Sequence, residues 1–349
     1  MSEIQLMEVC GTHTMAIAKS GIKTILPEGV KLLSGPGCPV CVTPTVIIDA
    51  VLKLSERDHV MIATYGDMLK VPGSRKGDSL SKRKAQGARV EMIYSPMDAL
   101  ELAKKNPDME IVFLGVGFET TAPGTAACIR AASENGLQNF SVFCMLKKIE
   151  PALRTLIESD GFNVQGFLCP GHVAVIIGEE GFRFLADEYH MPAVIAGFEP
   201  TEILLAIKKL LVQISRSEPK LENAYTKVVE PAGNLQAKQI IQEVFTDTPD
   251  FTAQVSYTDL WRGLGRIPAS GYGIRSEYAA FDAVKKFDVH FIEEEQVSTC
   301  RCGDVICGRI APEQCPLFGR SCTPADPEGP CMVSGEGACA AAYLYRNQI

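Results

Sequence analysis

The sequence has no apolar run that approaches the ~18 residues needed to span a bilayer. Its first residues, MSEIQLMEVCGTH, show neither the basic start nor the apolar stretch of a secretion signal. Clustered basic residues are also scarce: the net charge is −8, and the most basic stretch, 81–84, is short enough to be a solvated loop or helix end. These absences predict a cytoplasmic protein whose partners are neither membranes nor nucleic acids.

Nucleotide-binding loops are missing as well. The sequence contains no GxxxxGK[ST] motif, and the segment Gly115-Val116-Gly117 lacks the third glycine of a dinucleotide fingerprint. We therefore do not expect the chain itself to bind ATP or NAD.

Short apolar runs alternate with amphipathic stretches from residue 4 to about residue 200. The predicted strands are Ile4–Val9, Val30–Ser34, Val60–Thr64, Val90–Tyr94, Ile111–Val116, Phe140–Leu146, Gly166–Leu168 and Ala193–Ala196. The predicted helices include Pro44–Glu56 behind a Thr43 cap, a helix that opens at Ser95-Pro96 and ends near Lys105, and Thr201–Ile214. This alternation predicts an α/β fold with parallel sheets covered by helices on both faces.

A chain of 349 residues with 46% apolar content is long enough for two or three domains. A weak internal echo between ATYGDMLKVPGS (63–74) and LGVGFETTAPGT (114–125) suggests two lobes, with a boundary at the turn Asn106-Pro107-Asp108. We predict a first α/β lobe over 1–106, a second over 107–214, and a mainly helical region over 215–349. That last region contains predicted helices at Leu235–Phe245 and Glu277–Phe287 and ends in a Cys-rich tail.

Thirteen cysteines in a cytoplasmic chain indicate metal or redox chemistry, because the reducing cytosol disfavours a disulfide framework. Seven of them lie in the last 50 residues, and Cys10, Cys38 and Cys41 form a second group. Cys128 and Cys144 lie in apolar stretches, and we interpret them as small core residues.

In the tail, Cys315, Cys322, Cys331 and Cys339 are separated by six, eight and seven residues, with prolines and glycines between them. Ligation by thiolates alone suits an iron–sulfur cluster or an all-thiolate zinc site. The tail contains neither a CxxC zinc knuckle nor the cysteine spacing of ferredoxins. An iron–sulfur cluster bound there would therefore have an unusual ligand pattern. Cys300 and Cys302 add thiols beyond the four that a cubane needs and could pass electrons to a disulfide. A metal site that only staples the tail is the alternative.

The second cysteine group lies where two predicted strands end. MEVCGTHT places Cys10 and His13 after the first strand, and GPGCPVC places Cys38 and Cys41 just ahead of the next predicted helix. A CxxC at a helix start has thiolates favoured by the helix dipole, which indicates redox or metal chemistry. Cys10 could instead be a buried strand residue, His13 a core histidine, and the CxxC half of a zinc site. Because both loops follow strands of the same predicted lobe, the three thiols could converge on one site.

Taken together, CGTHT, GPGCPVC, GFETTAPGT, CPGHV and the tail CPLFG…CTPADPEGPCMVSGEGAC resemble the HypD family of [NiFe]-hydrogenase maturation factors. The resemblance runs from residue 10 to residue 339. It implies two α/β lobes, a third region with a [4Fe–4S] cluster, and a role in building the Fe(CN)2CO unit of the hydrogenase. It also implies two partners, a small HypC-like chaperone and a HypE-like cyanide carrier, with a monomer outside that complex.

The resemblance carries the iron site onto Cys10, Cys38 and Cys41, with Thr12 and His13 beside it. It carries cluster ligation onto the tail cysteines, with the set of four left open: Cys315, Cys322, Cys331 and Cys339, or a set in which Cys302 replaces one of them. Thiolates suit the iron, and donors from Thr12, His13 and backbone N–H groups suit the cyanide nitrogens.

Glu119 and His172, each predicted in a strand-end loop of the second lobe, are further candidates for the same cleft. A helix-cap carboxylate and an ordinary loop histidine are the structural alternatives.

Two other functions fit the same residues. One is an iron–sulfur-dependent reductase that exchanges electrons between thiols and protein disulfides. The other is a binding module whose tail holds structural zinc. A brown protein would contradict the zinc module, and iron-bound cyanide and CO would contradict a simple reductase.

Overall fold

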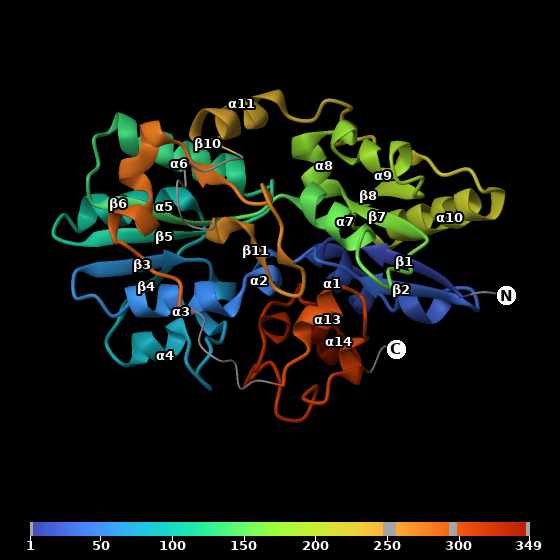
Figure 1. Cartoon of the computed structure of the whole chain (residues 1–349), viewed down its shortest axis with the longest axis horizontal. Helices are drawn as coiled ribbons and strands as arrows, with labels where there is room; N and C mark the ends of the chain where they lie inside the picture. The colour runs from blue at the N-terminus through green and yellow to red at the C-terminus, as the bar shows by residue number, and fades with distance from the viewer. Residues whose placement is uncertain (1–2, 247–255, 293–298, 347–349) are drawn as a thin grey trace.

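The computed structural model describes residues 3–246, 256–292 and 299–346. Two parallel sheets lie side by side, each flanked by helices, and the end of the chain folds beneath the junction between them (Figure 1). The predicted α/β class with two parallel-sheet lobes and a Cys-rich region is confirmed. Among the described residues, no helix is both long enough and apolar enough to cross a membrane.

One sheet has five strands in the order β2-β1-β7-β8-β9, and every pair is parallel. The strands are β1 (Ile4–Glu8), β2 (Val30–Ser34), β7 (Gly166–Pro170), β8 (Ala193–Ala196) and β9 (Leu221–Asn223). Its helices are α1 (Gly11–Lys19), α8 (Gly171–Ile177), α9 (Arg183–Asp187) and α10 (Pro200–Arg216). Strands β7 and β8 are buried along their whole length, as expected for parallel strands covered on both faces.

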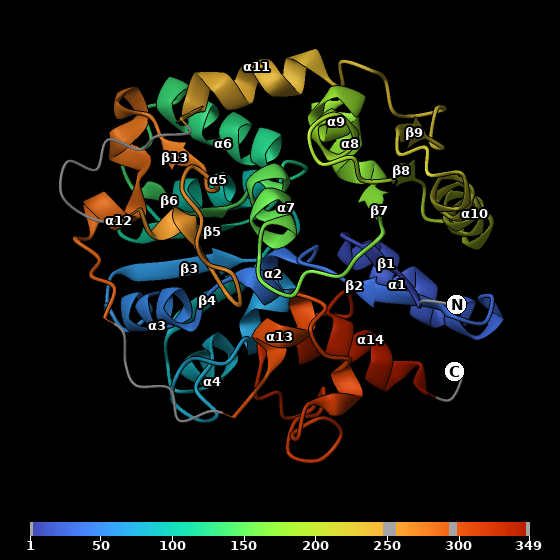
Figure 2. The same ribbon diagram turned by 45° about the vertical axis from the view of Figure 1, so that its right-hand side comes forward.

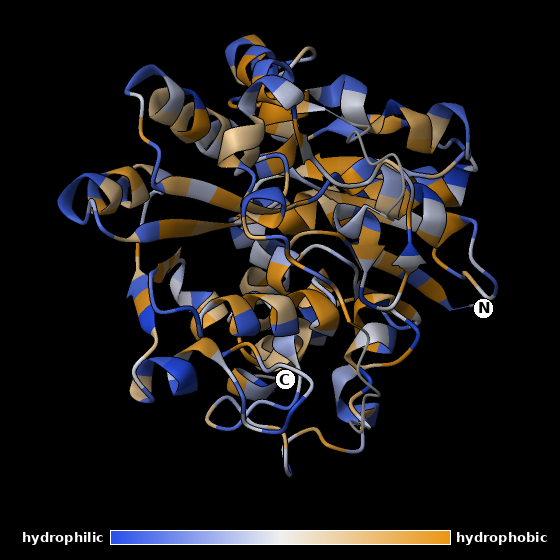
Figure 3. Cartoon of the chain, turned by 60° about the vertical axis from the view of Figure 1, so that its left-hand side comes forward, coloured by the Kyte–Doolittle hydropathy of each residue, from blue (hydrophilic) through white to orange (hydrophobic). Residues whose placement is uncertain are grey.

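The other sheet has four parallel strands in the order β4-β3-β5-β6. The strands are β3 (Val60–Thr64), β4 (Arg89–Met92), β5 (Glu110–Gly117) and β6 (Phe140–Leu146). The surrounding helices are α3 (Thr45–Leu54), α4 (Leu80–Ala85), α5 (Pro96–Lys105) and α6 (Ala122–Glu134). Helix α7 (Ile149–Ile157) lies instead against α9 of the five-stranded lobe, where its Arg154 donates to Glu188 at 2.6 and 2.8 Å. Figure 3 shows hydrophobic residues gathered on the strands, while the outer loops are largely hydrophilic.

The strand pairing differs from the predicted division at residue 106. Strands β1 and β2 pair with β7 rather than with β3, and β5 pairs with β3. The turn at Asn106 lies inside one lobe, where Asn106 ends α5 and its carbonyl oxygen accepts a hydrogen bond from the Asn139 side chain at 3.1 Å. The echoed segments 63–74 and 114–125 follow neighbouring strands of one sheet. A local turn and a local repeat carry no information about which lobe a strand joins, so the prediction failed there.

After β9 the chain contains short elements that tie the lobes together. Helix α11 (Leu235–Val244) packs against α6 of one lobe and α8 of the other (Figure 2). Four two-residue strands follow: β10 (Phe245–Thr246), β11 (Leu260–Trp261), β12 (Gly265–Arg266) and β13 (Gly273–Ile274). The predicted helix at 277–287 is two helices, η5 (Ser276–Phe281) and α12 (Ala283–Lys286), because Asp282 caps the second one by accepting from the Val284 N–H.

The tail contains α13 (Cys302–Ile306), the 3-10 helix η7 (Pro330–Met332) and α14 (Ala338–Leu344). It packs beneath α1 and the four-residue helix α2 (Pro39–Val42), which lies between the two sheets (Figure 1). The two cysteine-bearing segments, nearly 300 residues apart in sequence, therefore meet in space.

Candidate cysteine site

The loops after β1 and β2 pack directly on each other. The Gly11 N–H donates to the Gly37 carbonyl at 3.1 Å, and the Gly35 N–H donates to the Glu8 carbonyl at 2.8 Å. A Cβ on Gly37 would lie 2.2 Å from the Cys10 backbone nitrogen, so only glycine fits there. Adjacent parallel strands thus bring the Cys10 loop and the CxxC loop together at their carboxyl ends.

The CxxC forms its own short helix. Cys38 caps α2, its sulfur accepts from the Cys41 N–H at 3.2 Å, and the two cysteines are joined in a disulfide with their Cα atoms 5.2 Å apart. The predicted Thr43 cap of the following helix is wrong. Thr43 ends α2 and donates its hydroxyl to the Pro39 carbonyl at 2.9 Å, while Pro44 precedes α3 without a side-chain cap.

Cys10 is the N-cap of α1 and is buried beside two carboxylates. Its N–H donates to Glu8 at 3.0 Å, and Thr14 donates its hydroxyl to the other Glu8 oxygen. Burial raises the pKa of the Cys10 thiol to about 12, and nearby Glu8 and Glu336 add to that shift. Burial also raises the pKa of Glu8 to about 7. The thiol is therefore protonated at neutral pH.

His13 and His172 meet through one aromatic ring. Both imidazoles stack on Phe198, with ring centroids 4.6 and 3.8 Å away. His13 is fully buried and its Nε2 lies 2.9 Å from the Gly197 carbonyl, which can only accept, so Nε2 carries the proton. Burial lowers the pKa of His13 to about 4. The neutral ring leaves Nδ1 as a buried acceptor with no hydrogen-bond partner.

Glu336 joins this group from the tail, and the sequence analysis did not single it out. It accepts a hydrogen bond from the Thr12 hydroxyl at 2.6 Å, across 324 positions of sequence. Its charge also acts on His172, whose pKa is lowered chiefly by burial. Glu336 belongs to the GEGAC motif of the tail. Nothing in that motif indicates that the Glu336 carboxylate reaches α1.

The tail thiols form a hydrogen-bonded row. Cys302 bonds to both Cys300 and Cys331, and the Cys331 thiol donates to the Cys339 sulfur at 3.1 Å. The hydrogen bonds from Cys300 and Cys331 hold the pKa of Cys302 well below its usual value, and Arg262 strengthens the effect. The same bonds raise the pKa of Cys300 and of Cys331. Cys315 and Cys322 are also buried and complete the set of predicted tail ligands.

No group of three or more potential ligating side chains, within the described ranges, has an arrangement that could hold a metal ion. The donor chemistry of the tail nevertheless suits an iron–sulfur cluster, since the buried donors are thiols and the Cys331 and Cys339 sulfurs already touch. The structure therefore supplies the donor set but not a coordination geometry.

Arg262 connects the tail to the CxxC helix, and it was missed from sequence. Its guanidinium donates to the Thr43 carbonyl at 3.2 and 2.9 Å, its N–H donates to the Val42 carbonyl at 2.8 Å, and it hydrogen-bonds Cys302. The Cys41 sulfur of α2 lies 4.0 Å from the carbonyl oxygen of Pro330, the neighbour of Cys331. The disulfide is thus next to the tail thiols.

Glu119 and His172 lie on different lobes, contrary to the prediction that both belong to the second one. Glu119 follows β5, whereas His172 is exposed in the first turn of α8, after β7. Glu119 is buried, one oxygen accepts from the Ile149 N–H at 2.9 Å, and the other has no partner. The two residues therefore follow strands of separate sheets.

Burial raises the pKa of Glu119 from 4.5 to about 7. Because the folded state holds its proton more tightly than the unfolded chain, this carboxyl favours folding below pH 4.5, and the benefit disappears as the pH rises through 7. Glu119→Gln keeps the acceptor for Ile149 and removes the charge. We expect its stability relative to the wild type to rise by about 3 kcal/mol between pH 4.5 and pH 8.

Urea unfolding at both pH values measures this change. Glu230→Gln, at an exposed position, is the matched control. Its stability relative to the wild type should not rise with pH in this way. A stability difference between Glu119→Gln and the wild type that stays constant with pH would contradict the buried, proton-binding carboxyl.

Comparison of the sequence with known proteins finds relatives that match it along nearly its whole length. A family model described as "HypD: Hydrogenase formation hypA family" matches residues 1–346. The hydrogenase maturation factor HypD of Escherichia coli (strain K12) is 44% identical over 350 residues, which covers 99% of this chain and 90% of the relative. HypD of Rhodobacter capsulatus is 43% identical over 346 residues, which covers 98% of this chain and 89% of the relative. The similarity thus includes both lobes and the Cys-rich tail.

Proposed function

The chain belongs to the HypD family of hydrogenase maturation factors, and from this premise we propose that it is a scaffold for assembling the Fe(CN)2CO unit of [NiFe] hydrogenase. The observation that carries the proposal is the meeting of three thiol-bearing segments. The Cys10 loop packs on the CxxC loop, and the CxxC disulfide lies against the tail thiols. In this proposal, that meeting would put iron binding next to electron supply.

In this proposal the iron is cargo, held by Cys10, Cys38 and Cys41. Thiolates suit a soft, low-spin iron, and binding would displace the proton that burial keeps on Cys10. Backbone N–H groups at the start of α1 would donate to the cyanide nitrogens. The expected donor role of His13 changes to that of an acceptor, because its only proton points to the Gly197 carbonyl.

The CxxC pair would supply the electrons that release cyanide from a carrier thiocyanate. The reaction RSCN + 2 CysSH → RSH + CN⁻ + Cys–S–S–Cys + H⁺ balances atoms and charge: two thiols are oxidised and the S–CN bond is reduced. The disulfide between Cys38 and Cys41 is the oxidised form that this step would leave. Reduction back to the dithiol would prepare the next cycle.

We propose that the tail binds a [4Fe–4S] cluster through Cys315, Cys322, Cys331 and Cys339, or through a set in which Cys302 replaces one of them. Such a cluster, when bound, supplies single electrons at a low potential. The burial of these thiols and the contact between the tail and α2 support the assignment. Glu336 and Thr12 would hold the tail against α1, which carries the Cys10 end of the site.

The resemblance to the family implies two partners that would serve this chemistry: a HypE-like protein that carries the thiocyanate, and a HypC-like chaperone that accepts the iron. A metal passed without release needs a ligand from each protein, so the chaperone's thiol should reach the iron close to Cys10. The infrared spectrum of the co-purified complex tests the scaffold, since bands from iron-bound cyanide and CO are expected from it. Absence of those bands in an intact complex would favour a thiol–disulfide reductase.

Cys10→Ala tests the shared ligand. We expect the variant to weaken the chaperone complex by about tenfold or more and to lose the infrared bands, because changes at metal sites typically cost at least that much. Pull-down with the chaperone and infrared spectra measure the two effects, and the tail absorbance should be unchanged. Cys128→Ala, in the buried core, is the control and should retain the complex and the bands. An intact, iron-bearing complex with Cys10→Ala would contradict the assignment.

A further inference from the structure

The half-buried guanidinium of Arg262 lies between the CxxC helix and the tail thiols. It donates to the Thr43 carbonyl, at the end of α2, at 3.2 and 2.9 Å, and it hydrogen-bonds the Cys302 thiol. None of the carboxylates in the described ranges forms an ion pair with it. Arg262 therefore binds the two redox segments through carbonyl groups and sulfur instead of through acids.

The acids of the neighbouring segments have other partners. Glu328 lines the same small pocket as Arg262, but its carboxylate lies 3.3 Å from Lys76. Asp304 of α13 lies 2.9 and 3.5 Å from two other arginine side chains. Asp259 accepts hydrogen bonds from two backbone N–H groups farther along its own segment at 3.1 and 3.4 Å. The charge of Arg262 is thus left to act on the carbonyl groups and the sulfurs beside it.

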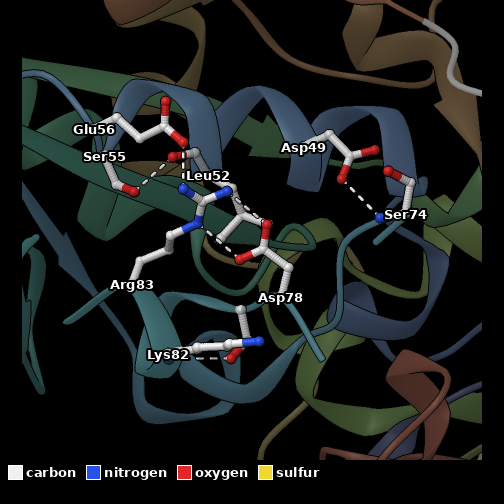
Figure 4. A network of polar contacts seen from close by, with 9 residues as sticks. Asp49, Leu52, Ser55, Glu56, Ser74, Asp78, Lys82 and Arg83 are labelled. Carbon is white, nitrogen blue, oxygen red and sulfur yellow. Dashed lines mark hydrogen bonds and ion pairs between the residues drawn. The ribbon is translucent and has the colours of Figure 1, made fainter. Parts of the chain in front are cut away.

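Arg83, at the surface of the four-stranded lobe, has the opposite arrangement. Figure 4 shows its guanidinium between two acids: it bonds both Asp78 oxygens at 2.7 and 2.6 Å and also contacts Glu56 beyond the end of α3. Those carboxylates neutralise the cation, and the contacts attach the loop before α4 to α3. The comparison shows why Arg262, which has no such acids, is suited to an electrostatic role at the thiols.

The strand β11 holds Arg262 in place. Lys147, fully buried at the end of β6, donates to the Thr258 and Leu260 carbonyls at 2.6 and 2.8 Å. Its ammonium also lies 5.5 Å from the centroid of the Trp261 ring, which is itself buried. The residues just before Arg262 are therefore fixed to the four-stranded sheet, so the cation is preorganised and need not be rearranged when the charge near it changes.

The Cys38–Cys41 disulfide is close to this cation. Cys41 is followed directly by the two residues whose carbonyl oxygens accept from Arg262. The Cys41 sulfur lies 4.0 Å from the Pro330 carbonyl, and Pro330 lines a pocket of about 40 Å³ together with Arg262 and Cys302. Cys38 and Cys41 are 6% and 1% exposed, so salt and water screen the interaction only weakly.

We propose that Arg262 is a positioning residue that holds the CxxC helix beside the tail thiols and makes the Cys38–Cys41 disulfide easier to reduce. This inference rests on the proposed redox role of that pair. In the reduction the S–S bond breaks, and two electrons and two protons from a dithiol reductant turn the disulfide into two thiols while the reductant becomes a disulfide. Reduced sulfur carries more negative charge than disulfide sulfur, so a fixed cation beside it stabilises the reduced form and raises the reduction potential.

The test equilibrates the anaerobically purified full chain with mixtures of reduced and oxidised dithiothreitol. Alkylation followed by mass spectrometry measures the fraction of Cys38 and Cys41 in the dithiol form at each ratio. We expect Arg262→Gln to lower the equilibrium constant for reduction about tenfold, which corresponds to about 30 mV. Arg262→Lys keeps the charge but cannot form the two-pronged bond to Thr43, so it should lower the constant only about threefold.

Arg275→Gln is the matched control. Arg275 is also half-buried and donates to two backbone carbonyls at the end of α11, those of Gln242 at 2.8 Å and Phe245 at 3.0 Å. Helix α11 lies on the opposite side of the molecule from the tail (Figure 1). The control should have the wild-type constant, and a shift there as large as that of Arg262→Gln would overturn the inference.

Equal constants in the wild type and Arg262→Gln would also overturn it, and so would equal shifts in the Gln and Lys variants, which would show that lost packing rather than lost charge is the cause. Thermal unfolding checks that each variant folds. If Arg262→Gln does not, Arg262→Lys decides, and an unchanged constant in that variant counts against the inference. A wild-type pair that stays oxidised at every ratio would contradict the redox role itself, so the two failures are distinguishable.

Discussion

Cys41→Ser is expected to abolish hydrogenase maturation, with a loss of at least two orders of magnitude in the activity restored to a strain that lacks the gene. Even residues behind a metal ligand commonly change affinity or activity 10- to 100-fold, and Cys41 is proposed both as an iron ligand and as half of the redox pair. Serine is a poor ligand for soft iron and cannot form the disulfide. Cys38→Ser should behave in the same way.

The fold should survive this change. Serine differs from cysteine by one atom, and α2 keeps its Arg262 and Thr43 contacts, which use backbone carbonyls. Cys128→Ser is the matched control, because its side chain bonds the Pro96 carbonyl at 3.1 Å and a hydroxyl can keep that bond. Thermal unfolding and tail absorbance should match the wild type in all three variants. Normal hydrogenase activity with Cys41→Ser would refute the role of the pair.

The second large effect is expected in the tail. Replacing Cys315, Cys322 or Cys339 by alanine should remove bound iron and the broad visible absorption together, because a cluster that loses a thiolate ligand is no longer held. The tail should also lose order. It contains little regular secondary structure, so the free energy of binding the cluster would contribute directly to its folding. Iron analysis, absorption spectra and limited proteolysis of the anaerobic protein measure the three effects.

A cysteine of the same segment serves as the control. Cys307 is buried and its thiol donates to the Gly263 carbonyl at 3.5 Å, outside the proposed ligand set. Cys307→Ala should keep iron and absorption. Full iron retention in all three ligand variants would remove the cluster assignment, and a colourless wild-type protein that contains zinc would favour a stapled binding module.

Much of the local structure could be predicted from the sequence. Strands β2, β3 and β6 begin and end where their apolar runs predict, and β1 and β2 stop just before the Cys10 and Cys38 loops. These features depend on side-chain periodicity and on turn residues within about ten positions. The helix at 277–287 failed for the same local reason, because the cap at Asp282 competes with the apolar pattern.

The candidate site was predicted in part. That Cys10 and the CxxC lie together followed from two strands ending in one sheet, and the structure agrees. Arg262 and Glu336 were missed because arginine and glutamate are common on surfaces, and nothing near them in sequence marks their partners. His13 was identified, but only its bond to Gly197 shows that its free nitrogen is an acceptor.

The sequence by itself determined the element types, the positions of the thiols and the family to which the motifs belong, because each depends on residues close together in the chain. The tertiary structure alone decided that β1 joins β7, that Thr12 reaches Glu336, and that the tail lies on the CxxC helix. These contacts join residues 160 to 324 positions apart. The free energy that stabilises these contacts comes from burying complementary surfaces of helices and strands that have already formed. A local sequence pattern therefore cannot predict them.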